Sequence, residues 1–156
     1  DLLREDDRLR FVLVGDGAFQ MTGLELSNAA RFGLHPIVLL FNNDGFGMQR
    51  LFQDGDFNDI GRWNYQKVVE LIGGGRAWRV DTPEALQSAL TEASAHREAP
   101  SLIEVMVERG DRSAGLTTLG KALLRDKAGA CPMGDENEGP CEHHGKCAYC
   151  RAAIWR

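Results

Sequence analysis

The stretch that decides the fold reads RFVLVGDG at residues 10–17 and PIVLLFNN at residues 36–43. Two short apolar runs within it, Arg10–Val14 and Pro36–Phe41, have the length and composition of buried strands. The residues between them change to a helical period, with apolar positions three and four apart. A strand, a helix and a second strand in succession predict parallel pairing with a right-handed crossover.

The connecting helix has start and stop signals of its own. Thr22 and Glu25 have the spacing of a capping box, which places the predicted start near Thr22. Gly33 can end a helix in a left-handed conformation, and Pro36 just beyond it cannot continue one. The N-terminus of this helix would lie at the carboxyl edge of the sheet, where free N–H groups favour an anion.

The rest of the chain continues the alternation. Strands are predicted at Ala77–Val80 and Ser101–Val107, and helices around Val68–Ile72, from Thr82-Pro83 onward and at Leu116–Arg125. Such alternation predicts the α/β class with an open, doubly wound parallel sheet. The first strand begins within about ten residues of Asp1, so we expect a domain over residues 1–126 that is truncated at its N-terminus, followed by an irregular cysteine-rich tail over residues 127–156.

Charge and hydropathy exclude some functions. The chain has 18 basic and 23 acidic residues, a formal net charge of -5, and no basic stripe along the sequence, which argues against nucleic acid as a partner. Its longest apolar run, Pro36–Phe41, is too short to cross a membrane, and the first residues do not resemble a signal peptide. We therefore expect a cytoplasmic protein.

Polar residues follow each of the first two predicted strands. Gly15-Asp16-Gly17 comes after one strand and Asn42-Asn43-Asp44-Gly45 after the other, so both segments should meet at the carboxyl edge of one sheet. Glycine at this edge allows the backbone to approach an anion closely. The simpler interpretation of Gly15–Gly17, taken alone, is a tight turn in which Asp16 caps a helix.

Asp16 decides which ligand fits this edge. A dinucleotide fingerprint requires a third glycine where Gln20 stands, and the Asp16 carboxylate would repel a bare pyrophosphate. A hard divalent cation removes that conflict. Magnesium prefers oxygen ligands, which the Asp16 carboxylate, the Asn43 amide oxygen and the Gly45 carbonyl can supply together with phosphate oxygens.

These segments resemble the thiamine-diphosphate enzymes, whose signature is GDG, an interval of about 25 residues, and then NN. Here 24 residues lie between Gly17 and Asn42. The resemblance extends through AFQMTGLELS at 18–27, FND at 57–59 and SLIEV at 101–105, and within the superfamily it is closest to the bacterial phenylpyruvate and indolepyruvate decarboxylases. It implies a diphosphate-binding domain of the PP type that requires thiamine diphosphate and Mg²⁺.

The resemblance also implies roles for individual residues. Asp16, Asn43 and Gly45 would be magnesium ligands, and the backbone N–H groups of Gly17 and Ala18 would bind the diphosphate. The full set expected near the cofactor is Gly15, Asp16, Gly17, Ala18, Asn43, Gly45, Phe46 and Met48. Gln49 is the candidate catalytic residue, but yeast-type pyruvate decarboxylases have a Glu at this position that assists proton transfer, and Gln49 cannot titrate.

The implied activity is non-oxidative decarboxylation of a 2-oxo acid, with phenylpyruvate or indolepyruvate favoured as substrate. The activating Glu of such enzymes lies on a pyrimidine-binding domain of a facing subunit, so the resemblance implies a homodimer or homotetramer and predicts that residues 1–156 alone are inactive. An acetolactate-synthase-like carboligase, of which Met48 is reminiscent, is one alternative. A non-catalytic cofactor-binding module with a metal-binding tail is another.

The tail contains four cysteines, Cys131, Cys141, Cys147 and Cys150, within twenty residues. In a cytosolic protein this density suggests zinc more than disulfides. The spacing is irregular, however, since Cys147 and Cys150 form a single CxxC pair and a four-cysteine zinc ribbon normally has two. A zinc site and a tail without fixed structure both remain open, with an iron-sulfur cluster or disulfides as further alternatives.

Overall fold

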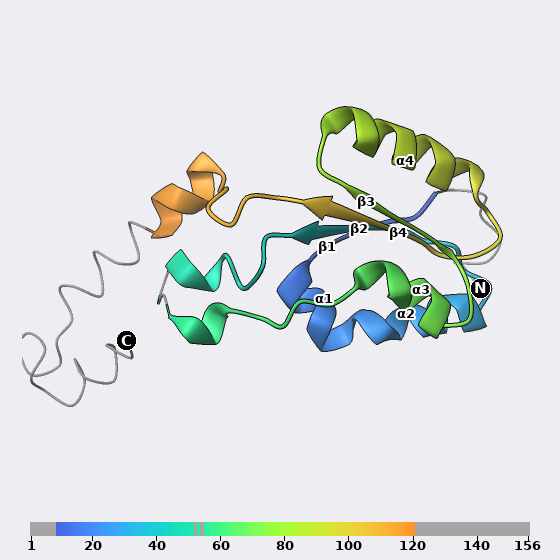
Figure 1. Cartoon of the computed structure of the whole chain (residues 1–156), viewed down its shortest axis with the longest axis horizontal. Coiled ribbons are helices and arrows are strands. Elements are labelled where there is room, and N and C mark those ends of the chain that lie inside the picture. Colours follow the sequence, from blue (N-terminus) through green and yellow to red (C-terminus); the bar gives the residue numbers. More distant parts are fainter. Residues whose placement is uncertain (1–8, 52, 54, 121–156) are drawn as a thin grey trace, which may run out of the picture. The chain divides into compact units, whose positions relative to one another are not determined.

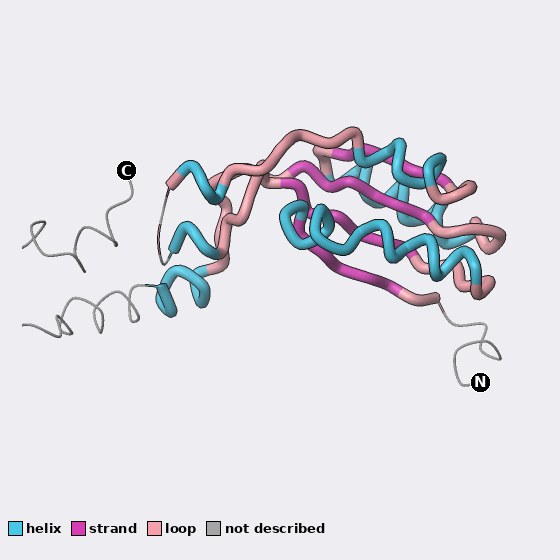
Figure 2. The backbone as a smooth tube through the Cα atoms, turned by 90° about the horizontal axis from the view of Figure 1, so that it is seen from below, coloured by secondary structure: helices cyan, strands magenta, loops and turns pink. Residues whose placement is uncertain are grey.

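The computed structural model describes residues 9–51, 53 and 55–120. Its centre is a four-stranded sheet in the order β1-β2-β4-β3, in which every strand is parallel to its neighbours. The strands are β1 (Phe11–Gly15), β2 (Ile37–Asn42), β3 (Arg76–Val80) and β4 (Ser101–Met106). They lie side by side in Figure 2, and the predicted parallel α/β sheet is confirmed.

Helices cover both faces of the sheet (Figure 1). The helix α4 (Pro83–Ala95) lies on one face, and α1 (Asp16–Thr22), α2 (Leu26–Arg31) and α3 (Val68–Leu71) lie on the other. Successive side chains of a strand point to opposite faces, so each face has its own core. The buried residues under α1 and α3 are Phe19, Val38, Leu40, Tyr65, Val68, Val69 and Leu102, and those under α4 are Ile37, Val80, Ala89, Ala93 and Ile103.

The first helix begins earlier than the sequence predicts. Gly15, the last residue of β1, is the N-cap in an extended conformation, and α1 starts at Asp16. Thr22 makes no side-chain cap hydrogen bond, and the chain continues through a single 3-10 turn, η1 (Gly23–Glu25), into α2. The predicted start at Thr22 is therefore wrong. The chain turns directly from strand to helix because Phe19, 3% exposed, packs into the core beneath α1.

The predicted ends and starts of other elements are confirmed. Gly33 terminates α2 with a φ of 65°, and the N–H of Leu34 donates to the Ala29 carbonyl across the turn. Thr82 caps α4, because its Oγ1 accepts a hydrogen bond of 3.2 Å from the N–H of Ala85. Gly73, Gly74 and Gly75 all have positive φ values and end the segment of α3, as expected.

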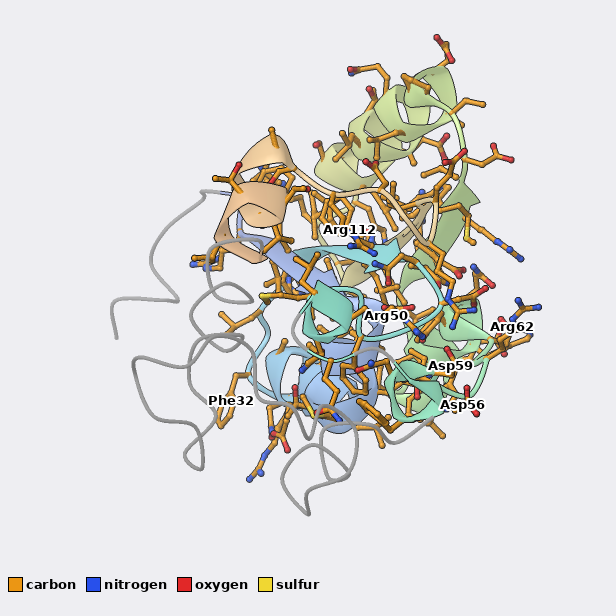
Figure 3. All side chains as sticks on the ribbon, turned by 90° about the vertical axis from the view of Figure 1, so that its left-hand side faces the viewer. Phe32, Arg50, Asp56, Asp59, Arg62 and Arg112 are labelled. Carbon is orange, nitrogen blue, oxygen red and sulfur yellow. The ribbon has the colours of Figure 1, made fainter. Side chains whose placement is uncertain are left out.

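The described residues divide into two compact units. One contains residues 9–46 and 60–109, with the whole sheet and its helices, and the other contains residues 47–59, apart from 52 and 54, and 110–120. The second unit includes the 3-10 turns η2 (Gln49–Leu51) and η3 (Asp56–Asn58), an ion pair between Arg50 and Asp59 (Figure 3), and a helix over residues 114–120.

Three expectations extend beyond the described residues. The predicted helix at 116–125 is described only as far as 120, and the proposed boundary at 126 stays a prediction. Cys131, Cys141, Cys147 and Cys150 lie outside the described residues, as does any zinc site they would form.

Within the described part of the chain, no helix has the length and hydropathy that a membrane span requires.

Candidate metal centre

The ends of β1 and β2 bring the two predicted segments together. These strands pair in parallel with Gly15 opposite Phe41, so the residues that follow each strand leave the sheet at the same edge. Asp16 is the first residue of α1, and Asn43 begins the loop after β2. The fold therefore places the GDG and NN segments side by side.

Three polar groups of this edge lie close together. One terminal atom of the Asn43 amide lies 2.8 Å from the carbonyl oxygen of Gly45 and 3.2 Å from Oδ1 of Asp16. In the protein alone, both oxygens are satisfied when this atom is the NH₂ nitrogen, which donates a hydrogen bond to each of them. The reversed amide would place its oxygen there, beside two other oxygens, and a cation would then hold the three together.

The spacing of these oxygens fits a bound cation. Magnesium holds oxygen ligands at about 2.0–2.1 Å in octahedral geometry, so neighbouring ligands at right angles are roughly 2.9 Å apart. The two distances from the end of the Asn43 amide, 2.8 and 3.2 Å, bracket that separation. A carboxylate, an amide oxygen and a backbone carbonyl are also ligand types that magnesium accepts. The residues present therefore fit the ion.

Asp16 is a buried carboxylate, with 1% of its surface exposed. Its Oδ1 accepts a hydrogen bond of 2.9 Å from the N–H of Gly17, and its Oδ2 accepts one of 3.0 Å from the N–H of Gly45. Burial raises the pKa of this carboxyl, while these backbone hydrogen bonds act in the opposite direction. Among the described residues no Lys or Arg forms an ion pair with Asp16, so a cation would supply the missing countercharge.

The loop after β2 is held in an uncommon backbone conformation. Asp44 has a φ of 58° and Gly45 a φ of 146°. The Asn42 side-chain oxygen accepts a 3.1 Å hydrogen bond from the Asp44 N–H, which closes an Asx turn. The exposed Arg62, labelled in Figure 3, forms a 2.8 Å ion pair with Asp44. The turn directs the Asn43 amide and the Gly45 carbonyl to the same side.

Gly17 and Gly15 differ in what surrounds them. A Cβ atom on Gly17 would lie 2.6 Å from the Phe46 ring, whereas one on Gly15 would meet nothing within 4 Å. Gly17 is therefore needed for the approach of Phe46. Its N–H already donates to Asp16, while Ala18 is exposed on the first turn of α1, so diphosphate binding by Gly17 and Ala18 stays a prediction.

The remaining predicted residues, Met48 and Gln49, belong to the second compact unit. Met48 is 60% exposed, and Gln49 is exposed at the start of η2. Their predicted roles beside the cofactor, and the catalytic role of Gln49, stay predictions.

A polar pocket of about 270 Å³ opens beside Asp16. Apart from Asp16, sequence reasoning assigned none of its lining residues to the site, and Glu104 of β4 and Tyr65 are among those that it missed. Burial raises the pKa of Tyr65, whose hydroxyl accepts a 3.0 Å hydrogen bond from Gln20. The lining consists of Asp16, Asn42, Asp44, Ile60, Gly61, Arg62, Trp63, Tyr65, Arg79, Glu104 and Met106. A charged residue inside the apolar strand SLIEVM was the signal that could have identified Glu104.

Clusters of three or more His, Cys, Asp or Glu side chains are absent from the part of the chain that the structure describes. The candidate ligand set therefore has one carboxylate, from Asp16, together with the amide oxygen of Asn43 and the carbonyl of Gly45. This composition is suited to a cation that shares its coordination shell with an anionic ligand.

The sheet and this edge define a doubly wound α/β domain of the class that binds ligands where its strands end. Comparison with known families identifies the particular one: residues 2–105 match the model described as thiamine pyrophosphate enzyme, C-terminal TPP binding domain. The chain belongs to this family. The resemblance seen in the GDG and NN segments is thereby confirmed.

Two proteins similar to this chain are decarboxylases of 2-oxo acids. The chain is 48% identical over 99 residues to an indole-3-pyruvate decarboxylase of Azospirillum brasilense. The aligned residues make up 63% of this chain and 18% of that protein. It is 37% identical over 122 residues to a pyruvate decarboxylase of Neurospora crassa, and the aligned residues make up 76% of this chain and 21% of that protein. The chain thus spans about a fifth of the length of these relatives.

A solved structure supports the fold. The benzoylformate decarboxylase from Polynucleobacter necessarius superposes with a TM-score of 0.59 and 22% sequence identity, over 66% of this chain and 20% of that one. At this level of identity the likeness concerns the fold alone.

Proposed function

We propose that this chain is the diphosphate- and magnesium-binding part of a thiamine-diphosphate-dependent decarboxylase that acts on 2-oxo acids. Asp16, Asn43 and Gly45 would hold the magnesium ion, and the ion would bind the cofactor's diphosphate. The observation that carries the proposal is the placement of the Asn43 amide 2.8 Å from the Gly45 carbonyl oxygen and 3.2 Å from the buried Asp16 carboxylate. The family and the names of the relatives support the cofactor and the reaction class.

When bound, thiamine diphosphate supplies the nucleophilic carbon and accepts the electron pair released with carbon dioxide. The residues of this chain would do the binding. Asp16 would provide negative charge to the cation, the Asn42–Asp44 turn would present Asn43 and Gly45, and Phe46 would close one side of the Gly17 backbone. Proton transfer to the cofactor would depend on a pyrimidine-binding domain in the same or a partner chain.

For the substrate, we propose a preferred type of 2-oxo acid. An indolepyruvate or phenylpyruvate type is favoured because the chain is 48% identical to the indole-3-pyruvate decarboxylase and 37% identical to the pyruvate decarboxylase. Product analysis with indolepyruvate, phenylpyruvate and pyruvate, once a pyrimidine-binding domain is supplied, tests the preference. Assembly as a homodimer or homotetramer remains a prediction from the resemblance, and a cytoplasmic location remains a prediction from the sequence.

Magnesium binding tests the proposal directly. Mg²⁺ titrated into the chain at a fixed excess of thiamine diphosphate should raise the melting temperature, because a ligand that binds only the folded state stabilises it. Asp16→Asn keeps the side-chain volume but removes the charge, and it should abolish the Mg²⁺-dependent part of the rise.

The matched control is Glu98→Gln, which makes the same change of charge at an exposed residue in the turn before β4, at the opposite edge of the sheet. It should respond to Mg²⁺ as the unaltered chain does. If Mg²⁺ raised the melting temperature of Asp16→Asn as much as that of the unaltered chain, the proposed ligand set would be contradicted.

A further inference from the structure

Glu104 of β4 is a carboxylate buried among amide groups. It is 3% exposed and stands in a strand that is otherwise mostly apolar. Its Oε1 accepts a 2.6 Å hydrogen bond from Nδ2 of Asn42, and its Oε2 accepts one from Nε2 of Gln66. Burying a charged group costs free energy unless the group is hydrogen-bonded. The two amide donors compensate the buried Glu104 carboxylate and hold it in a defined position.

The contact with Glu104 decides which way the Asn42 amide faces. An Asn side chain has one donor end and one acceptor end. With Nδ2 directed to Glu104, the oxygen is left to accept the N–H of Asp44 at 3.1 Å. An amide turned the other way would set its oxygen against the Glu104 carboxylate and its NH₂ against the Asp44 N–H, and neither contact would be a hydrogen bond.

The Asn42 oxygen in turn holds the loop that carries the candidate ligands. The Asx turn supports Asp44 at a φ of 58°, a conformation that non-glycine residues seldom adopt. Directly beyond it, the Gly45 N–H donates to Asp16 Oδ2 at 3.0 Å. A chain of hydrogen bonds therefore runs from Glu104 through Asn42 to the backbone between Asn43 and Gly45.

We infer that Glu104 is a positioning residue for the metal centre, acting through the orientation of the Asn42 amide. Its hydrogen-bond partners are Asn42 and Gln66, and none of the three candidate ligands is among them. Its contribution is to keep the loop in the conformation in which the Asn43 and Gly45 oxygens face Asp16. This inference rests on the proposed function, since it gives Glu104 a role only if those oxygens bind a cation.

Two variants of Glu104 separate positioning from simple packing. Glu104→Leu removes both acceptors and frees the Asn42 amide to turn. The affinity for Mg²⁺ at a fixed excess of thiamine diphosphate should fall about 10–100-fold, the usual loss when a residue that supports metal ligands is removed. Glu104→Gln should stay within roughly twofold of the unaltered chain, because its oxygen can still face Asn42 while its NH₂ group faces Gln66, whose amide can turn to accept.

Gln66→Leu is the matched control, because it removes the other hydrogen bond of Glu104 and leaves Asn42 in place. Its Mg²⁺ affinity should be unchanged, even where its melting temperature without metal is lower. Calorimetric Mg²⁺ titration gives the affinity, and the melting temperature of the metal-free protein gives the structural effect separately. Equal losses of affinity in Gln66→Leu and Glu104→Leu would overturn the inference, as would an unchanged affinity in Glu104→Leu.

The exchanged pair Glu104→Gln with Gln66→Glu provides the test if Glu104→Leu does not fold. It keeps net charge and volume, and position 104 still offers an acceptor to Asn42, so Mg²⁺ affinity should be retained. A loss of about tenfold or more would overturn the inference. The unaltered chain and Asp16→Asn are titrated alongside. Absence of Mg²⁺ binding in the unaltered chain overturns the proposed function and this inference together, whereas binding that depends on Asp16 but not on Glu104 overturns the inference alone.

Discussion

Single atoms decide the chemistry at the edge of this sheet. The end of the Asn43 amide lies 2.8 Å from the Gly45 carbonyl oxygen and 3.2 Å from Asp16 Oδ1, in a loop that two hydrogen bonds hold in place. Asp16 and Asn43 were identifiable from sequence, since an acidic and an amide residue after neighbouring parallel strands must meet. The charge of Glu104 inside an apolar strand was visible in the sequence, but its contact with Asn42, 62 residues away in the chain, was not.

The two glycines that flank Asp16 provide a test at this scale. Gly17→Ala should destabilise the fold by roughly 1–3 kcal/mol, because the new methyl group would lie 2.6 Å from the Phe46 ring and crowd it. Urea denaturation followed by circular dichroism measures the loss.

Gly15→Ala is the control for this prediction. Gly15 has an ordinary φ of -79°, and a Cβ atom there would meet nothing within 4 Å, so stability should hardly change. Combining Gly17→Ala with Phe46→Ala should recover part of what Gly17→Ala loses. Equal effects of the two single glycine substitutions would show that crowding by Phe46 is not the cause.

At the scale of elements, the strands and the short helix α3 were predictable, whereas the start of α1 was not. Arg10–Val14 and Ser101–Val107 were predicted where β1 and β4 lie, to within one residue at each end, because a buried parallel strand requires a continuous apolar run. The start of α1 was missed because a local capping pattern at Thr22 was given more weight than the core contact of Phe19.

The segment between β2 and α3 shows why local rules fail. The 3-10 turn η4 (Tyr65–Lys67) includes the buried Tyr65, which Gln20 of α1 reaches with a 3.0 Å hydrogen bond across 45 residues of chain. The rings of Phe19 and Tyr65 also meet edge to face at 5.8 Å. Tertiary contacts of this kind shape the segment, and no periodicity in its own sequence reveals them.

The cap of α4 gives the prediction at the element scale. Thr82→Ala removes the acceptor of the Ala85 N–H and should cost about 1 kcal/mol of stability. Thermal denaturation of the chain measures it.

Thr91→Ala in the same helix is the matched control. The Thr91 hydroxyl donates to the Gln87 carbonyl within the helix and caps nothing, and alanine is the better helix former, so this variant should be at least as stable as the unaltered chain. A loss in Thr91→Ala as large as in Thr82→Ala would rule out the cap as the source of the effect.

For the sheet-containing unit as a whole, one edge stands out. Among the described residues β1 pairs with β2 alone, and its side chains Phe11, Val12 and Leu13 are 48, 44 and 67% exposed. Phe32 at the end of α2, labelled in Figure 3, is another exposed aromatic residue of this unit. An exposed apolar edge strand is a site at which chains associate.

Association through this edge is the prediction at the largest scale. Residues 1–156 should form concentration-dependent oligomers in sedimentation velocity, and Leu13→Lys should weaken them because a charged side chain on an edge strand opposes pairing. Leu71→Lys introduces the same change at a leucine of α3 that is 72% exposed. Association that responds equally to both variants would be inconsistent with a role for β1.

The two orientations of the Asn43 amide have a further consequence for how the proposed magnesium ion would enter. Turned by half a revolution, the NH₂ group bridges the Gly45 carbonyl and the Asp16 carboxylate by itself, so the side chain carries an internal substitute for the cation. Loading would then be an exchange of one occupant for another, with rotation of this side chain coupled to each arrival and departure. The NMR signals of the Asn43 NH₂ protons would shift as Mg²⁺ and cofactor bind, reporting on the exchange atom by atom.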